Sequence, residues 1–114
     1  MQASGDDDPN RDTLDAIASE LSRAKDAKGH PLRVVRIPSP GRVLSTEGEV
    51  IPASHMNFYI GNRTVLLPVF GTPYDQAAVD ALQALFPDRK VVARSARAIL
   101  EGGGTFHCMT QQVP

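Results

Sequence analysis

Apolar residues recur at intervals of three and four near the start of the chain: Leu14, Ile17 and Leu21. This spacing places them on one face of a helix, with mostly polar residues elsewhere around it. Asp8 is suited to the N-cap and Pro9 to the first helical position. The pattern therefore predicts an amphipathic helix that begins at Pro9 and ends near Gly29.

The next stretch changes from helical spacing to a short run of β-branched residues. Residues 33–37 read Arg-Val-Val-Arg-Ile, which predicts a strand, and the prolines and glycine of 38–41 would close it. Residues 40–54 contain two further breakers and no clear period. A segment of this length predicts either a functional loop or a covering segment.

The second half of the chain reads as a hairpin followed by a helix and strands. Residues 57–60 and 64–70 predict two strands joined through Gly61-Asn62, a dipeptide suited to a tight turn. Further elements are predicted in order: a helix capped by Thr72, begun by Pro73 and stopped by Pro87; a strand over 90–93; a helical turn over 96–100; and an extended segment over 105–109.

This order of helix, strand, hairpin, helix, strand and strand predicts an α/β fold made of two unequal pieces of a repeated unit. The first piece lacks opening strands of its own. We therefore expect a truncated unit, the alternative being a small α/β sandwich that begins with a helix. Boundaries are expected after residue 8, which ends a polar entry loop, and after residue 54.

Composition narrows the function classes. The chain has 114 residues, of which 41% are hydrophobic and 22% charged, with a formal net charge of −1. These values indicate one globular unit, with neither a basic face for nucleic acid nor a polybasic tract or long apolar run for a membrane. The single cysteine and the absence of a signal-peptide pattern favour a cytoplasmic location.

The candidate chemistry lies near the end of the chain, where Gly102, Gly103 and Gly104 precede Cys108, the only cysteine. Glycines allow positive φ or a close approach of another group, and a thiolate is a strong nucleophile toward electrophilic carbon. The alternative is a small buried cysteine after a flexible loop. No metal-ligand spacing and no nucleotide-binding glycine motif occurs, so no cofactor and no metal is expected.

Other polar residues near this motif are given structural roles. In an extended strand, neighbouring side chains point to opposite faces, so His107 is expected to point away from the substrate side of Cys108. His30 and His55 are expected at the surface or as capping residues. Glu101 is expected to be solvated or capping rather than buried.

Several segments together closely resemble agmatine deiminase, and the related bacterial peptidylarginine deiminases share much of the pattern. The segments that carry the resemblance are Gly102–Gly104, His107–Cys108, Thr110–Gln112, Asn57–Ile60, Asp26–Gly29 and Leu85–Arg89. They extend in order over nearly the whole chain from about Asp8. They correspond to the C-terminal portion of the family pattern only.

The resemblance implies the five-bladed α/β propeller of the guanidino-group-modifying (pentein) superfamily. Residues 9–54 would complete the penultimate module and add a long loop, and 55–114 would form the last module. It implies that Cys108 is the nucleophile that attacks a guanidino carbon, releases ammonia and yields N-carbamoylputrescine, a precursor of putrescine. Gly102–Gly104 would let the substrate approach their backbone.

The family's catalytic histidine and guanidinium-binding aspartates have no match in this chain. The resemblance therefore implies an incomplete site, with missing N-terminal propeller modules or further copies of the chain as partners, and agmatine as the cationic guanidino substrate. Two alternatives stay open: a non-catalytic α/β structural or interaction module derived from this fold, and a fragment of the peptidylarginine deiminase type.

Overall fold

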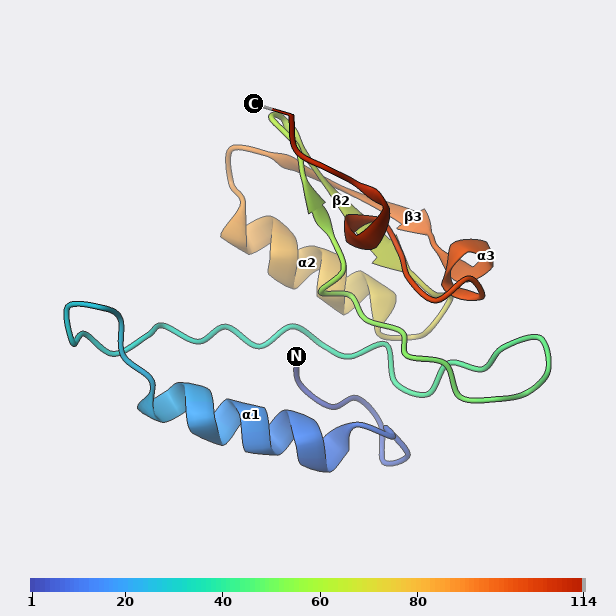
Figure 1. Cartoon of the computed structure of the whole chain (residues 1–114), viewed down its shortest axis with the longest axis horizontal. Helices are drawn as coiled ribbons and strands as arrows, with labels where there is room; N and C mark the ends of the chain where they lie inside the picture. The colour runs from blue at the N-terminus through green and yellow to red at the C-terminus, as the bar shows by residue number, and fades with distance from the viewer. Residues whose placement is uncertain (114) are drawn as a thin grey trace.

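A three-stranded sheet with one helix packed against it forms the second half of the chain (Figure 1). The computed structural model describes residues 1–113. Its strands are β1 (Tyr59–Ile60), β2 (Thr64–Val69) and β3 (Lys90–Ser95), and the sheet order follows the chain order. β1 and β2 form the predicted antiparallel hairpin, whereas β2 and β3 are parallel and joined through helix α2 (Asp75–Leu85). A parallel pair requires such a crossover, because a tight turn can only reverse the chain.

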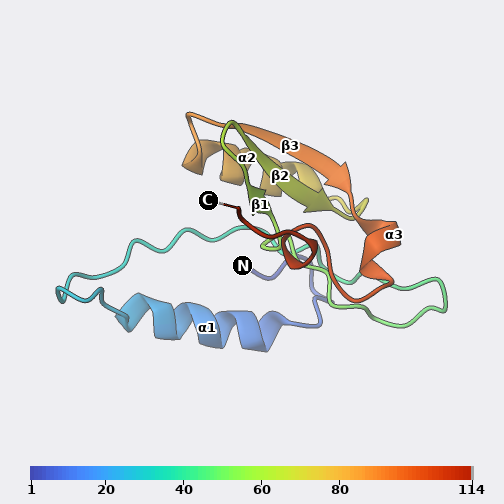
Figure 2. The same ribbon diagram turned by 45° about the horizontal axis from the view of Figure 1, so that its top comes forward.

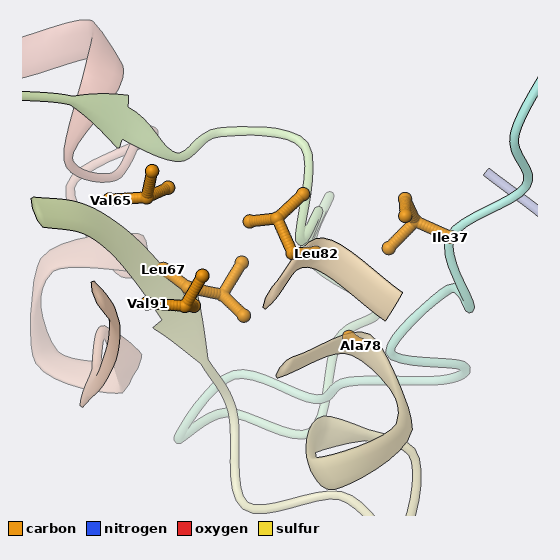
Figure 3. Close-up of a cluster of buried hydrophobic side chains, with 6 residues drawn as sticks. All are labelled: Ile37, Val65, Leu67, Ala78, Leu82 and Val91. Carbon is orange, nitrogen blue, oxygen red and sulfur yellow. The ribbon is translucent and has the colours of Figure 1, made fainter. Parts of the chain in front are cut away.

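The two faces of β2 pack into different clusters. Val65 and Leu67 point toward α2 and are fully buried, while Leu66 contacts a second cluster on the other face. Figure 3 shows the first cluster, to which α2, β2, β3 and the incoming segment all contribute: Ile37, Val65, Leu67, Ala78, Leu82 and Val91. The alternation along β2 thus positions both a helix and the C-terminal segment around one sheet.

Helix α1 is shorter than the sequence pattern predicts. It extends over Arg11–Arg23, so it begins two residues after Pro9 and ends well before Gly29. Asp8 is buried and accepts hydrogen bonds from the backbone N–H groups of Ser4 and Asn10, so its carboxylate closes the preceding turn. α1 lies apart from the sheet in both views (Figures 1 and 2).

The predicted strand over residues 33–37 is wrong. Within residues 1–113, no ladder pair forms at residues 33–37, and the isolated bridge between Gln2 and Pro38 lies just beyond them. Val34 and Val35 are 38% and 42% exposed. β-branched residues favour extended backbone, but a strand also needs a neighbour to accept and donate its hydrogen bonds.

The predicted extended segment over 105–109 is also wrong. Residues His107–Met109 form one turn of 3₁₀ helix (η1), which follows the short helix α3 (Arg97–Leu100) and the glycines. The side chain of Asn57 accepts hydrogen bonds from the backbone N–H groups of His107 and Cys108, and this contact favours a turn over a strand. α3 itself confirms the helical turn predicted for residues 96–100.

The start of α2 depends on Asp75. Its carboxylate accepts hydrogen bonds from the backbone N–H groups of Phe70, Gly71 and Thr72, at 2.7–3.3 Å. Thr72 Oγ1 accepts from the N–H of Tyr74, so Thr72 acts near its predicted place although the helix begins at Asp75 and not at Pro73. One carboxylate thus organises the loop between β2 and α2.

His55 is fully buried, so the expectation that it lies at the surface is wrong. Its Nδ1 lies 2.8 Å from the carbonyl oxygen of Pro38, and its Nε2 lies 2.9 Å from Oδ1 of Asp75. The ring therefore connects the segment before the long loop to the start of α2. Separately, no helix within residues 1–113 has the length and apolar character needed to cross a bilayer.

We expect Leu82→Ala to lower the free energy of unfolding by about 2–5 kcal/mol, because Leu82 is 1% exposed in the cluster between α2 and the sheet. Leu85→Ala on the same helix is the matched control. Leu85 is 36% exposed, so its replacement should cost no more than about 1 kcal/mol. Urea denaturation measures both, and equal losses would contradict this description of the core.

A second prediction concerns acid stability. Burial alone would raise the pKa of Asp75, but hydrogen bonds from His55 and from the loop N–H groups outweigh burial and hold this pKa below its ordinary value of 3.8. The unfolded chain therefore takes up this proton first as pH falls. The stability contributed by Asp75 is complete above the ordinary value and is lost as pH falls through the folded-state pKa.

Asp75→Asn should therefore lower the free energy of unfolding by about 2 kcal/mol at neutral pH, and the difference from the parent chain should shrink in acid. Urea denaturation over a pH series measures it. Asp80→Asn, an exposed carboxylate on the same helix, is the control and should change little. A constant difference at all pH values would refute the role given to the Asp75 carboxylate.

Candidate functional site

Cys108 lies in the middle of the η1 turn, with its side chain exposed. The Nδ2 group of Asn57 donates a hydrogen bond to its Sγ at 2.9 Å. This bond, followed by contributions from the backbone N–H groups of Thr105 and of Cys108 itself, lowers the pKa of the thiol below its ordinary value of 9.0. The side chain is therefore not the inert buried cysteine that the sequence left open.

Asn57 binds the cysteine turn with both ends of its amide. While Nδ2 reaches the sulfur, Oδ1 accepts from the backbone N–H groups of His107 at 2.9 Å and Cys108 at 3.2 Å. No local sequence pattern predicts a functional role for Asn57. The only sequence feature that could have indicated a role for Asn57 was its place in a segment that resembles a known family. Asn57 and Cys108 are 51 positions apart, so no local pattern connects them.

The three glycines have different structural tasks. The N–H groups of Gly102 and Gly103 bond to the carbonyl groups of Ile99 and Leu100 and so close the end of α3. Gly103 has φ of +93°, a conformation that favours glycine. A Cβ on Gly104 would lie 3.1 Å from Cβ and 3.4 Å from Sγ of Cys108, so the bare backbone leaves room beside the thiol.

A cavity of about 280 Å³ opens beside the thiol. It is lined by the three glycines, Cys108, and the apolar side chains of Ile99 and Met109. Within the described residues 1–113, no carboxylate lines it. A larger cavity of about 390 Å³, whose lining includes Arg42, Tyr74 and Arg97, contains neither Cys108 nor a histidine. The nucleophile predicted from the sequence and the glycines thus meet at one cavity, and the part of the chain that the structure describes contributes no acidic side chain to it.

The other polar residues near the motif lie outside the cavity. His107 is exposed, and within residues 1–113 no hydrogen bond joins its ring to Cys108. The strand alternation used to place His107 does not apply, because successive residues of a 3₁₀ turn are about 120° apart. Glu101 is exposed and accepts a hydrogen bond from the N–H of Thr46, as a capping carboxylate would. His30 is exposed and pairs with Asp26.

Neither the cavity nor its surroundings supplies a metal site. Within residues 1–113 no three histidine, cysteine, aspartate or glutamate side chains lie close enough to hold an ion. The site offers the Cys108 thiol as a nucleophile, beside a cavity wall made of glycine backbone and apolar side chains.

Comparisons with known proteins confirm the fold class. The structure superposes on an agmatine deiminase of Enterococcus faecalis with a TM-score of 0.87 at 29% identity, over 98% of this chain and 36% of that chain. It superposes on a provisionally named arginine deiminase of Porphyromonas gingivalis with a TM-score of 0.89 at 31% identity, over 99% and 33% of the two chains. The α/β unit is thus part of a pentein propeller of the deiminase class.

The chain belongs to the Porphyromonas-type peptidyl-arginine deiminase family, whose model matches residues 1–114. A Marinomonas protein provisionally named an agmatine deiminase is 39% identical over 94% of this chain and 33% of its own length. A Mycoplasma capricolum protein with the same name is 37% identical over similar shares. The chain spans about a third of the length of these curated relatives.

We expect Asn57→Ala to shift the pH midpoint of Cys108 alkylation by iodoacetamide to higher pH, because the thiolate loses the hydrogen bond that stabilises it most. At a pH below both midpoints, alkylation should slow by about threefold or more. Asn62→Ala, in the exposed hairpin turn, is the matched control. An unchanged midpoint in folded Asn57→Ala would refute the effect.

Proposed function

We propose that this chain supplies the nucleophile of an agmatine deiminase-type amidine hydrolase, and that Cys108 is that nucleophile. The observation that carries the proposal is the Asn57-bonded thiol of lowered pKa at the mouth of a glycine-lined cavity. A guanidinium carbon is a poor electrophile because resonance stabilises it, so its attack needs a thiolate rather than a hydroxyl. Family membership and the names of the relatives support agmatine as the substrate.

The proposed reaction proceeds in two steps. The Cys108 thiolate forms a C–S bond to the guanidino carbon, and the tetrahedral adduct collapses as one nitrogen takes up a proton and leaves as ammonia. Water then adds to the same carbon, and the C–S bond breaks to regenerate the thiolate. The sum is agmatine plus water giving N-carbamoylputrescine plus ammonia. No cofactor or metal is required by this balance.

The glycines would contribute through the space they leave. A guanidinium group is flat, and the bare backbone of Gly102–Gly104 lets such a group approach the sulfur without meeting a side chain. Ile99 and Met109 offer apolar contact suited to a methylene chain. The cavity therefore fits an uncharged stem and a planar head better than a compact anion.

The charge of the substrate is not matched within this chain. Among residues 1–113, no carboxylate lines the cavity and no base touches the thiol, although a cationic substrate requires both charge compensation and a proton donor for ammonia. We therefore propose that additional propeller modules, or further copies of this chain, supply these groups. The chain alone is then incomplete as a catalyst.

The surface of the chain supports a partner of this kind. Its accessible area is 7484 Å², against roughly 6,100 Å² expected for a compact monomer of this mass. Its radius of gyration is 14.9 Å, against about 13 Å expected. Apolar side chains remain exposed on α1 and on the extended segment after it: Ile17, Leu21, Leu32, Val34 and Val35.

We propose that this exposed apolar surface packs against neighbouring modules. In that assignment residues 1–8 are an entry loop, 9–54 complete one module, and 55–114 form the last one. The separation of α1 from the sheet supports the division (Figure 2). We further place the protein in the cytoplasm, in a route from agmatine toward putrescine, since its one cysteine must stay reduced to attack.

A chimera tests the proposal directly. In it, this chain replaces the matching third of the Enterococcus faecalis agmatine deiminase, and N-carbamoylputrescine and ammonia formed from agmatine are measured. We expect turnover that Cys108→Ala lowers by about 10⁴-fold or more, because the nucleophile is lost. Asn62→Ala, in the exposed hairpin turn, is the control and should retain activity.

As a monomer, the 114-residue chain should form no product from agmatine, because a single copy lacks the groups that compensate charge and donate a proton. A folded chimera that is inactive on both agmatine and peptidyl-arginine, or activity that survives Cys108→Ala, would refute the assignment of Cys108. Turnover of a peptidyl-arginine in place of agmatine would move the substrate to the peptidylarginine class while retaining Cys108.

A further inference from the structure

We propose that His55 is a positioning residue for the cysteine turn and that it acts as an imidazolium, with both ring nitrogens donating hydrogen bonds. Its effect passes through Asn57 to Cys108. The inference rests on the proposed function in one respect only, namely that Cys108 is the reactive group. The ring is 0% exposed, and its two bonds join parts of the chain that are 17 and 20 residues away.

The partners of the ring determine its protonation. Nδ1 faces the carbonyl oxygen of Pro38 at 2.8 Å, and a carbonyl can only accept. Nε2 faces Oδ1 of Asp75 at 2.9 Å. A neutral imidazole carries one proton, so it would direct a lone pair at one of these oxygens across a hydrogen-bond distance. Only the form with a proton on each nitrogen satisfies both contacts.

Asp75 cannot supply the missing proton in place of the ring. Among residues 1–113, every other hydrogen bond of its carboxylate is an accepted one, from the backbone N–H groups of Phe70, Gly71 and Thr72 and from the Thr72 hydroxyl. A carboxylate surrounded by donors in this way is held ionised. Asp75 is the charged group that the ring contacts, and the Phe70 ring, with its centroid 5.6 Å away, is a neighbour that tolerates a cation.

The link from His55 to the thiol is a single turn. The N–H of Met56 bonds to Oγ of Ser54, and the N–H of Asn57 lies 3.3 Å from the carbonyl oxygen of Ser54. His55 anchors this turn on its buried side. On the other side Asn57 holds residues 107 and 108 through its amide and accepts at its carbonyl from Thr105 Oγ1.

This arrangement makes the direction of the Asn57 amide depend on the buried ring. Its Nδ2 must lie within hydrogen-bond reach of Sγ to stabilise the thiolate, and hydrogen bonds weaken steeply with misalignment. If the His55 ring loses its hydrogen bond to Pro38 or to Asp75, the turn over residues 54–57 becomes more mobile, and the Asn57 side chain is held less firmly. The consequence would be a less stabilised thiolate with the sheet and α2 still in place.

The first test reads the ring itself. A ¹H–¹⁵N correlation spectrum of the 114-residue chain at neutral pH should show a proton on both ring nitrogens of His55, whose signals are assigned by elimination, without a His55 variant, from His30→Gln and His107→Gln at the two exposed histidines. His30, which is exposed beside Asp26, provides the internal comparison. A His55 ring with one unprotonated nitrogen would overturn the proposal, and this result needs no His55 variant and no catalytic activity.

The second test reads the thiol. In His55→Gln the buried contacts lose their charge and one of their two donors, so the pH midpoint of Cys108 alkylation by iodoacetamide should move to higher pH. The matched control His30→Gln should keep the parent midpoint. An unchanged midpoint in His55→Gln with a parent-like circular dichroism spectrum would reduce His55 to a merely structural role and overturn the positioning claim.

If His55→Gln does not fold, the ring spectrum and a further variant, Asp75→Asn, test the proposal. Asp75→Asn keeps a hydrogen-bond acceptor but removes the negative charge opposite the ring. There the alkylation midpoint should also rise. None of these readouts uses agmatine. An inactive chimera would therefore refute the proposed function without refuting this inference. Conversely, an unchanged alkylation midpoint in folded His55→Gln would refute this inference without refuting the proposed function.

Discussion

The hydrogen bonds between the side chain of Asn57 and the turn at Cys108 are the interaction on which the site depends. One amide accepts from two backbone N–H groups and donates to the sulfur, so it determines both the conformation of the turn and the state of the thiol. These contacts add to the hydrogen bonds within the turn, from the N–H groups of Met109 and Thr110 to the carbonyl groups of Phe106 and His107. The segment that leads into β1 therefore serves the cysteine as well as the sheet.

A second constraint is the set of hydrogen bonds that Asp75 and His55 make around the loop between β2 and α2. Asp75 gathers the N–H groups between β2 and α2, and His55 brings the segment at Pro38 to the same carboxylate. The polar groups of the interior are thereby satisfied, since within residues 1–113 no buried side-chain polar atom lacks a partner. The cavity at Cys108 differs, because it is uncharged and open. This contrast is what the proposed assembly with other modules explains.

Much of the fold followed from patterns in the chain, and the errors have a common cause. The hairpin, the helix before Pro87 and the short helix before the glycines were predicted correctly, because period, caps and turn residues are local signals. The strand at 33–37 and the extended segment at 105–109 were wrong. In both, the conformation depends on which distant groups offer or withhold hydrogen bonds.

The sequence by itself determined the family, the cysteine and the glycines beside it, because these depend on residue identity and on spacing within a few positions. Only the tertiary structure decided that Asn57 reaches the sulfur and that His55 is buried between two acceptors. Those contacts join residues 17 to 51 positions apart. Their formation depends on how the hairpin, α2 and the terminal turn pack together, and no local pattern records that packing.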